Sequence, residues 1–243
     1  MKVERLIAGS FTAPAGIFRK DDDLDRTVRY PVPVYVIETS DERILVDTGL
    51  NPAAVADPVA YYERPDVFAV ATLEQERSVA EQLDVASLSK VVVTHLHWDH
   101  VGGLSLIPAS VPLVIQRSEW EAGHDENAIA RNFFLTRDYA GQEREVELVD
   151  GDHDLLGDGS VELLLTPGHT PGHQSLRIGE LVLAIDVAHF ASGFDDHRFP
   201  VFADDHEQQA RSAERLRAMR DAGLSVVPGH DPEIVLPGVV TAS

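Results

Sequence analysis

Short apolar segments separated by polar turns run through most of the chain. Two of them, 32–38 and 43–47, flank the polar residues 39–42, which is the pattern of a strand hairpin with a longer turn. Residues 90–94 form a continuous β-branched run that is typical of a fully buried strand. Further segments are also predicted to be strands: 111–116, 146–149, 161–165, 174–178, 181–185 and 224–227.

Helices are expected in fewer places. The candidate segments are 72–83, 119–132 and 205–222. Thr72 is the expected cap of the first, and Leu216 lies on the inner face of the last. Residues 51–71 are expected to form a loop or lid. Strand hairpins interrupted by a few helices indicate two sheets with helices on the outside.

The chain has 243 residues, of which 44% are hydrophobic and 25% charged, as in an ordinary globular protein. We expect residues 1–243 to form one domain, because sandwich folds often reach this length undivided. The net charge of −21 argues against nucleic acid and anionic membranes as partners, since both attract clustered Lys and Arg. Neither a membrane-spanning run nor a signal peptide is visible, so a cytoplasmic location is expected.

The candidate chemistry lies directly after the buried strand, in the sequence His-Leu-His-Trp-Asp-His at 95–100. The chain has no cysteine, so only histidine and carboxylates could hold a transition metal. His95 and His97 are two residues apart and could face one ion, while Asp99 and His100 could face a second ion beside it. So dense a cluster predicts metal binding.

Two ions need more ligands than this segment supplies. Three further candidates each come just after a predicted strand: His169, Asp186 and His230. A divalent ion lowers the pKa of bound water from ~15.7 towards ~7, which makes hydroxide available at neutral pH. The residues therefore predict a metal-dependent hydrolase, but they do not choose between esters, thioesters, lactams and phosphodiesters.

In combination, these motifs resemble the metallo-β-lactamase superfamily. The resemblance rests on Leu-Val-Asp-Thr-Gly at 45–49, Val-Thr-His-Leu-His-Trp-Asp-His-Val-Gly-Gly at 93–103, and Gly-His-Asp at 229–231. It covers nearly the whole chain. It implies an α/β fold, namely a four-layer αβ/βα sandwich of two mixed sheets with helices on the outer faces, and a two-metal site at one edge of the sheets.

The resemblance also implies roles for the candidate ligands. Three histidines would hold the first ion: His95, His97 and His169. Three residues would hold the second: Asp99, His100 and His230. Asp186 would bridge the two ions, which would be divalent transition metals, zinc in first place with iron, manganese or cobalt as alternatives. A hydroxide between the ions would attack the substrate, and Asp99 would pass its proton to the leaving group.

The remaining histidines and one aspartate are placed outside the ligand set. Asp47 and His173 would support the ligands from behind without binding metal. Four histidines in polar stretches are expected at the surface: His124, His153, His197 and His206.

Within the superfamily, the chain looks most like the quorum-quenching N-acyl-homoserine lactone lactonases and relatives such as 4-pyridoxolactonase. The shared features are Pro-Val-Pro-Val-Tyr-Val-Ile at 31–37, the unbroken Thr-Pro-Gly-His-Thr-Pro-Gly-His at 166–173, Phe-Pro-Val at 199–201 with the helix that follows it, and a length without an appended domain.

One position departs from that pattern. These lactonases typically carry a tyrosine three residues after the bridging aspartate, and its hydroxyl contacts the lactone carbonyl; here the residue is His189. A histidine could donate the same hydrogen bond or transfer a proton, which would make His189 catalytic beside Asp99, or it could merely pack. Three phenylalanines could line an acyl-chain wall or belong to the ordinary core: Phe190, Phe194 and Phe199.

The function implied first is therefore a dinuclear metal lactonase acting on N-acyl-homoserine lactones or a similar small lactone. The alternatives are a general esterase or phosphotriesterase, a glyoxalase II-like thioesterase and a β-lactamase. Glyoxalase II enzymes carry a helical domain after the last ligands, whereas only 13 residues follow His230, and true β-lactamases generally lack the bridging aspartate. An RNase Z-like nuclease and a diiron redox protein fit less well. The expected partner is a small lactone or ester, and the oligomeric state stays open, a homodimer included.

Overall fold

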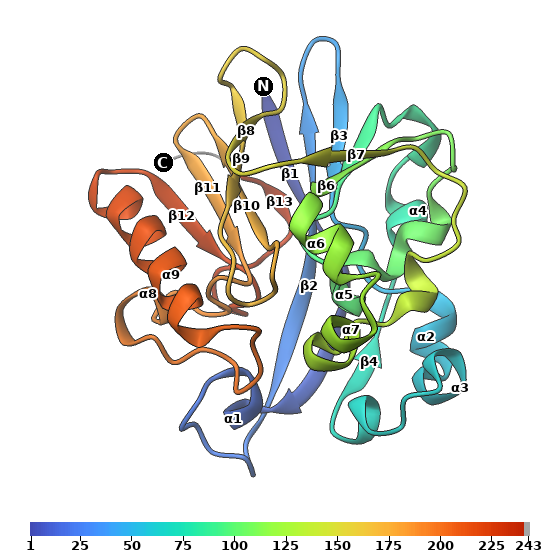
Figure 1. Ribbon diagram of the computed structural model, residues 1–243, viewed down its shortest axis with the longest axis vertical. Coiled ribbons are helices and arrows are strands. Elements are labelled where there is room, and N and C mark those ends of the chain that lie inside the picture. The colour runs from blue at the N-terminus through green and yellow to red at the C-terminus, as the bar shows by residue number, and fades with distance from the viewer. Residues whose placement is uncertain (241–243) are drawn as a thin grey trace.

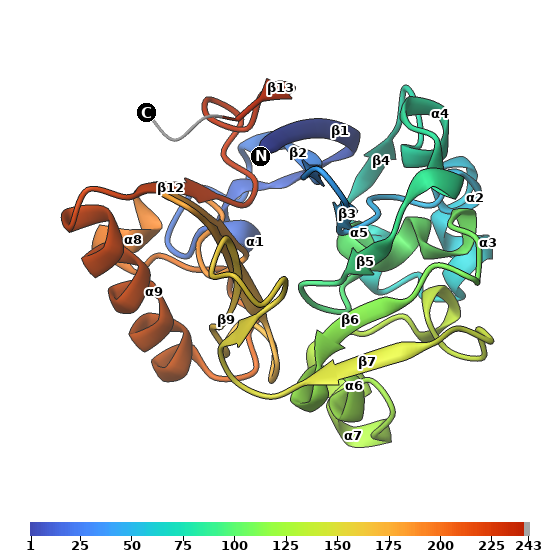
Figure 2. The same cartoon turned by 90° about the horizontal axis from the view of Figure 1, so that it is seen from above.

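Two β-sheets lie face to face in the computed structural model, which describes residues 1–240 (Figure 2). The first sheet has the strand order β13-β1-β2-β3-β5-β6-β7, with β4 paired to β1. Its strands are β1 (Lys2–Pro14), β2 (Thr27–Glu38), β3 (Arg43–Val46), β4 (Thr72–Glu74), β5 (Lys90–Val92), β6 (Leu113–Gln116), β7 (Val146–Val149) and β13 (Gly238–Val239). The second sheet has the order β12-β11-β10-β9-β8. Its strands are β8 (His153–Asp154), β9 (Val161–Leu165), β10 (Gln174–Ile178), β11 (Leu181–Ile185) and β12 (Ser225–Pro228).

Helices cover the outer faces of both sheets (Figure 1). The α-helices are α1 (Ala15–Phe18), α2 (Pro52–Ala56), α3 (Pro58–Tyr62), α4 (Val79–Gln82), α5 (Trp98–Val101), α6 (Arg117–Ala122), α7 (Glu126–Asn132), α8 (Gly193–Asp196) and α9 (His206–Asp221). The 3-10 helices are η1 (Val67–Ala69), η2 (Val85–Ser87), η3 (Gly102–Leu106) and η4 (Thr136–Asp138). Helices α4, α6 and α7 pack on the first sheet, and α8 and α9 on the second. Both sheets mix parallel and antiparallel pairs, so the predicted four-layer sandwich is confirmed.

Strand β2 contributes side chains to two hydrophobic cores, one between the sheets and one under the outer helices. Successive side chains of a strand point to opposite faces. Tyr35 and Ile37 pack between the sheets against residues of β9 to β11, while Val34 and Val36 pack under the helices on the outer face. A strand that is buried on both faces is therefore apolar at every position, which is why its sequence shows no alternation.

The predicted strands and the helix over 205–222 are confirmed; Asp205 caps that helix by accepting a hydrogen bond from the backbone of Gln208. The prediction of one helix over 72–83 is wrong. Residues Thr72–Glu74 pair with β1, and the helix begins only after Ser78, which forms a capping box with Glu81. Pairing with a distant strand here outweighs the local helical pattern.

Two other segments also differ from expectation. Residues 51–71 are not simply a loop, because Asn51 and Asp57 cap two short helices, α2 and α3, that each begin with proline. The expected helix over 119–132 is split into α6 and α7, because Asp125 starts a new helix by accepting a hydrogen bond from Ala128.

Among residues 1–240, no helix has the length and apolar character needed to cross a lipid bilayer. The assignment of residues 1–243 to a single domain stays a prediction.

Arg144 holds together the segment between η3 and β6. Its half-buried guanidinium donates hydrogen bonds to the carbonyls of Leu104, Ile107, Pro108 and Val111, with donor–acceptor distances of 2.6–3.3 Å. These carbonyls follow the segment 95–100 in the sequence, so Arg144 fixes the chain that comes directly after the predicted metal ligands.

We expect Arg144→Met to lower the free energy of unfolding by about 2 to 4 kcal/mol, because several carbonyls lose a charged donor at once. The matched control is Arg117→Met, since Arg117 makes only an exposed ion pair with Asp150 and should contribute less than about 1 kcal/mol. Urea unfolding measures both. Equal losses in the two variants would contradict this role of Arg144.

Candidate metal centre

Four chain segments that leave the carboxyl ends of β5, β9, β11 and β12 meet at one edge of the two sheets. They carry the seven side chains that the sequence singled out as ligands, and all seven are buried: His95, His97, Asp99, His100, His169, Asp186 and His230. Polar groups are rarely buried together without partners or ions, so this cluster marks a site.

The first group contains His95, His97, His169 and Asp186. The Nδ1 atom of His97 lies 3.1 Å from Nε2 of His95 and 3.0 Å from Nε2 of His169. The Oδ2 atom of Asp186 lies 3.4 Å from Nε2 of His169 and 3.8 Å from Nε2 of His95. Ligand atoms placed tetrahedrally at ~2.1 Å around a zinc-like ion lie ~3.4 Å apart, so the spacing fits one ion.

The second group contains Asp99, His100 and His230. Nε2 of His100 and Nε2 of His230 each lie 3.6 Å from Oδ2 of Asp99. They also lie 3.5 Å and 3.0 Å, respectively, from Oδ1 of Asp186. The two oxygens of Asp186 therefore face different groups, which is the geometry of a bridging carboxylate.

The atoms that face inward in the second group lack other partners. Nε2 of His100, Nε2 of His230 and Oδ1 of Asp186 are buried and make no hydrogen bond within residues 1–240. Such atoms are costly to bury unless an ion or water satisfies them. Together with a donor set of imidazole and carboxylate, these orphaned atoms show that the residues fit a pair of divalent cations.

Hydrogen bonds from behind orient the imidazole rings. The outer nitrogen of His100 donates to Asp47 at 2.8 Å, that of His97 to the carbonyl of Asn132 at 2.9 Å, and that of His230 to the carbonyl of Pro31 at 2.8 Å. Each of these bonds fixes the proton on the outer nitrogen and leaves a lone pair on the inner one, as metal ligation requires.

Asp47 and His173 lie where the sequence placed them, behind the ligands. Asp47 also accepts hydrogen bonds from the backbone and hydroxyl of Thr94. His173 is outside both groups, and its Nε2 accepts a hydrogen bond from the backbone of Asp186 at 3.1 Å. The remaining four histidines are exposed or half-buried and lie outside both groups: His124, His153, His197 and His206.

Burial and neighbouring charges shift the pKa values of different histidines in opposite directions. Burial lowers the pKa of His95 and His169 well below its usual range, so both rings are neutral and can act as ligands. For His100, burial is outweighed by the carboxylates of Asp186 and Asp99, and its pKa is raised. His100 thus lies between the carboxylates of Asp99 and Asp186, which attract protons or cations.

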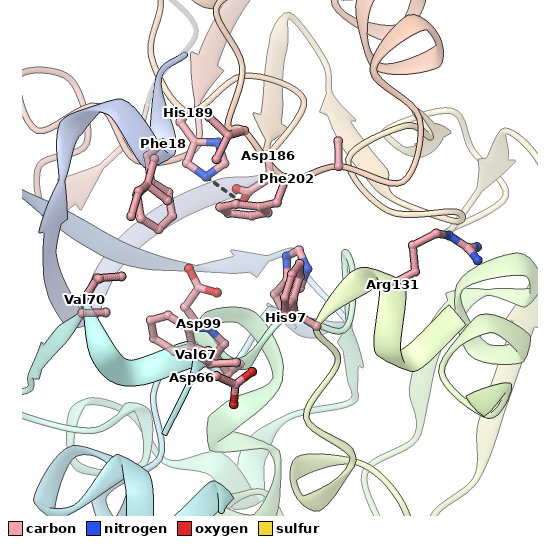
Figure 3. A pocket seen from close by; sticks show the side chains of 16 residues that line it. Phe18, Asp66, Val67, Val70, His97, Asp99, Arg131, Asp186, His189 and Phe202 are labelled. Atoms are coloured by element: carbon pink, nitrogen blue, oxygen red, sulfur yellow. Dashed lines mark ion pairs between the residues drawn. The ribbon is translucent and has the colours of Figure 1, made fainter. Parts of the chain in front are cut away.

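A pocket of about 470 Å³ opens onto the centre (Figure 3). His97, Asp99 and Asp186 form part of its lining, and its walls are largely apolar. The apolar wall residues include Ile17, Phe18, Val67, Trp98, Phe133 and Phe202. An apolar pocket with a few convergent polar groups is the usual form of a small-molecule site.

The sequence left open whether Phe190, Phe194 and Phe199 line an acyl-chain wall or belong to the core, and the structure favours the core, since none of them lines this pocket. Phe194 and Phe199 pack under α9, and Phe190 packs on the cluster around Tyr30. The aromatic residues that do line the pocket come from α1, α5 and irregular segments. The sequence offered no periodic signal for them, because loop positions follow no helix or strand repeat.

His189 lies in the pocket wall beside Asp186 (Figure 3). Its Nε2 is 3.4 Å from Oδ2 of Asp186, and its Nδ1 is buried without a hydrogen bond. Burial lowers the pKa of His189 to about 3. The ring is therefore neutral and faces both the ligands and the space where a substrate would lie.

Comparisons with known proteins agree with this site. The model of the family described as metallo-beta-lactamase superfamily matches residues 27–230. The chain belongs to this superfamily. Over 84% of its length it is 31% identical to an N-acyl homoserine lactonase of Bacillus cereus. Over the same share it is 29% identical to the N-acyl homoserine lactonase AttM of Azorhizobium caulinodans. Each match covers 82% of the relative's own length.

The fold of this metallo-β-lactamase superfamily member also resembles solved structures. One is an N-acyl homoserine lactone hydrolase with the product N-hexanoyl-L-homoserine at its catalytic metal centre; the TM-score is 0.83, with 26% identity, and 96% of this chain and 94% of that one are covered. The chain is thus a metal-dependent hydrolase, as the sequence predicted. The assignment of individual residues to each ion stays a prediction.

We expect Asp47→Ala to weaken the binding of one of two metal equivalents by about 10- to 100-fold, because His100 loses the acceptor that orients it. Titration of metal-free protein with Zn²⁺ or Co²⁺ in competition with a chelator measures this affinity. Asp41→Ala is the matched control, since Asp41 is an exposed carboxylate in the turn between β2 and β3. Unchanged affinity in Asp47→Ala would contradict the role of Asp47.

Proposed function

We propose that this hydrolase is a lactonase that opens N-acyl-homoserine lactones or a closely similar small lactone. The observation that carries the proposal is an apolar pocket that ends directly on two adjoining groups of His and Asp. A lactone with an acyl chain has the matching character, a polar ring to be hydrolysed and an apolar tail. The similarity to N-acyl homoserine lactonases at 29–31% identity supports the same substrate class.

We further propose that the first group, His95, His97 and His169, holds one divalent ion. The second ion would be held by Asp99, His100 and His230, with Asp186 shared between the two. Zinc is the first candidate, because the donors are imidazole nitrogens and carboxylate oxygens at tetrahedral spacing; iron, manganese and cobalt accept the same donors. When bound, such ions supply hydroxide at neutral pH and polarise a carbonyl group.

Asp99 is placed to move the proton of the reaction. It lies in the pocket lining (Figure 3), and its Oδ2 is 3.6 Å from Nε2 of His100 and 3.6 Å from Nε2 of His230. When the oxygen of a hydroxide forms a bond to the carbonyl carbon of the lactone, Asp99 would take the proton of that hydroxide. When the ring C–O bond breaks, the leaving alkoxide would take that proton from Asp99, giving the hydroxy acid.

His189 is placed to bind the carbonyl oxygen of the lactone. It stands in the pocket wall at the position where the related lactonases carry tyrosine, and it is held beside Asp186. Its neutral ring could donate one hydrogen bond to the oxygen on which charge develops, which is the part a phenol hydroxyl would play. The cytoplasmic location and the absence of a nucleic-acid partner stay predictions, and the oligomeric state stays open.

A substrate panel tests the lactonase proposal. Proton release is followed with acyl-homoserine lactones of several chain lengths, an aryl ester, a phosphotriester, a thioester and a β-lactam. We expect the highest kcat/KM for a lactone, and loss of turnover after chelation with recovery on adding Zn²⁺. Strong ester or phosphotriester turnover without lactone turnover would reject the proposal.

Three substitutions at one position test His189. His189→Ala and His189→Phe should lower kcat by about 10²-fold with two metal equivalents retained, because a donor to the developing charge is lost. His189→Tyr should keep most of the activity, since it restores a donor. Full activity in His189→Phe would show that His189 only packs.

A further inference from the structure

Glu119 is a fully buried carboxylate that none of the roles described so far uses. It lies on α6 and is 0% exposed. Burial raises its pKa to about 7, so the fold carries a cost for placing an acid here. A buried acid that is kept at such a cost is a candidate for a specific task.

Both oxygens of Glu119 accept hydrogen bonds from backbone amides. Oε1 accepts from Leu96 at 2.9 Å, and Oε2 accepts from Gly172 at 2.8 Å. Leu96 stands between His95 and His97, and Gly172 stands between His169 and His173. One carboxylate therefore connects the two loops that carry every histidine of the first group.

The packing around Glu119 is fitted to this contact. A Cβ atom on Gly172 would overlap the backbone nitrogen of Glu119 and approach its Cβ to 2.6 Å. At the other end of α6, a Cβ on Gly123 would overlap Cδ1 of Leu96. Glycine at both positions lets α6 approach the two loops closely, which is why the carboxylate can reach both amides.

We propose that Glu119 is a positioning residue for the first metal site, because it fixes the two histidine loops relative to one another. The inference rests on the proposed metal centre. Nδ1 of His97 lies 3.1 Å from Nε2 of His95 and 3.0 Å from Nε2 of His169. A small shift of either loop would therefore change the spacing of these nitrogens. Glu119 touches neither an ion nor the substrate, and it acts through the backbone of the loops.

Metal affinity of the folded protein tests the proposal. Glu119→Gln keeps the shape of the side chain but has a single acceptor oxygen, so one amide would face an NH₂ group. We expect the affinity for one metal equivalent to fall by about 10- to 100-fold, and the absorption spectrum of bound Co²⁺ to change. The matched control is Asp138→Asn, the same change at a buried carboxylate whose partner is the hydroxyl of Tyr62, and it should leave metal affinity unchanged.

Wild-type affinity for both equivalents in Glu119→Gln, or an equal loss in Asp138→Asn, would overturn the proposal. Because affinity is measured without substrate, a failure of lactone turnover rejects the proposed substrate and not this role. If Glu119→Gln does not fold, the proposal is tested by amide hydrogen exchange in the metal-free wild-type protein. The amides of Leu96 and Gly172 should then exchange slowly, whereas rapid exchange of both would overturn the proposal.

Discussion

The centre depends on one constraint: three of its five histidines are held by their outer nitrogens, so that their inner nitrogens face the other candidate ligands. The acceptors that do this are Asp47 for His100, the carbonyl of Asn132 for His97 and the carbonyl of Pro31 for His230. These acceptors come from the end of β3, from α7 and from β2, so the orientation of the rings requires that the first sheet and its helices be assembled correctly. The fold is thus a precondition of the chemistry, and not only a support for it.

The backbone is strained at the ends of two strands that lead into the centre. Asp47 and Ile185 adopt left-handed conformations, with φ of 59° and 51°. For residues with a side chain this conformation costs on the order of 1 kcal/mol or more, and it persists only where the surroundings determine it. At Asp47 the surroundings are Thr94 and His100; at Ile185 the chain turns so that Asp186 reaches both groups.

The sequence was informative where chemistry and pattern coincide. The β-branched run within 90–94 predicted a buried strand, and the polar residues after it had to lie at a strand end. The position of the cluster His95 to His100 therefore followed from the sequence alone. It was uninformative where distant segments meet. Residues Thr72–Glu74 join β1 only because the sheet has an open position there, and Glu119 lies in a helix with no motif around it. Such contacts are set by tertiary packing, which local periodicity does not encode.

The pocket and the centre are built from different parts of the chain. The ligands follow strand ends, whose positions the two sheets fix, whereas much of the apolar wall comes from short helices and irregular segments such as η1 and the residues before α9. Segments of the second kind tolerate changes in sequence and length because few backbone hydrogen bonds depend on them. Substrate preference can therefore change through the wall without disturbing the ligands. Val67 and Phe202 belong to this wall. Asp99 and His189 face the same space but adjoin His100, His230 and Asp186 at strand ends, so a change at either position would alter the centre as well as the wall.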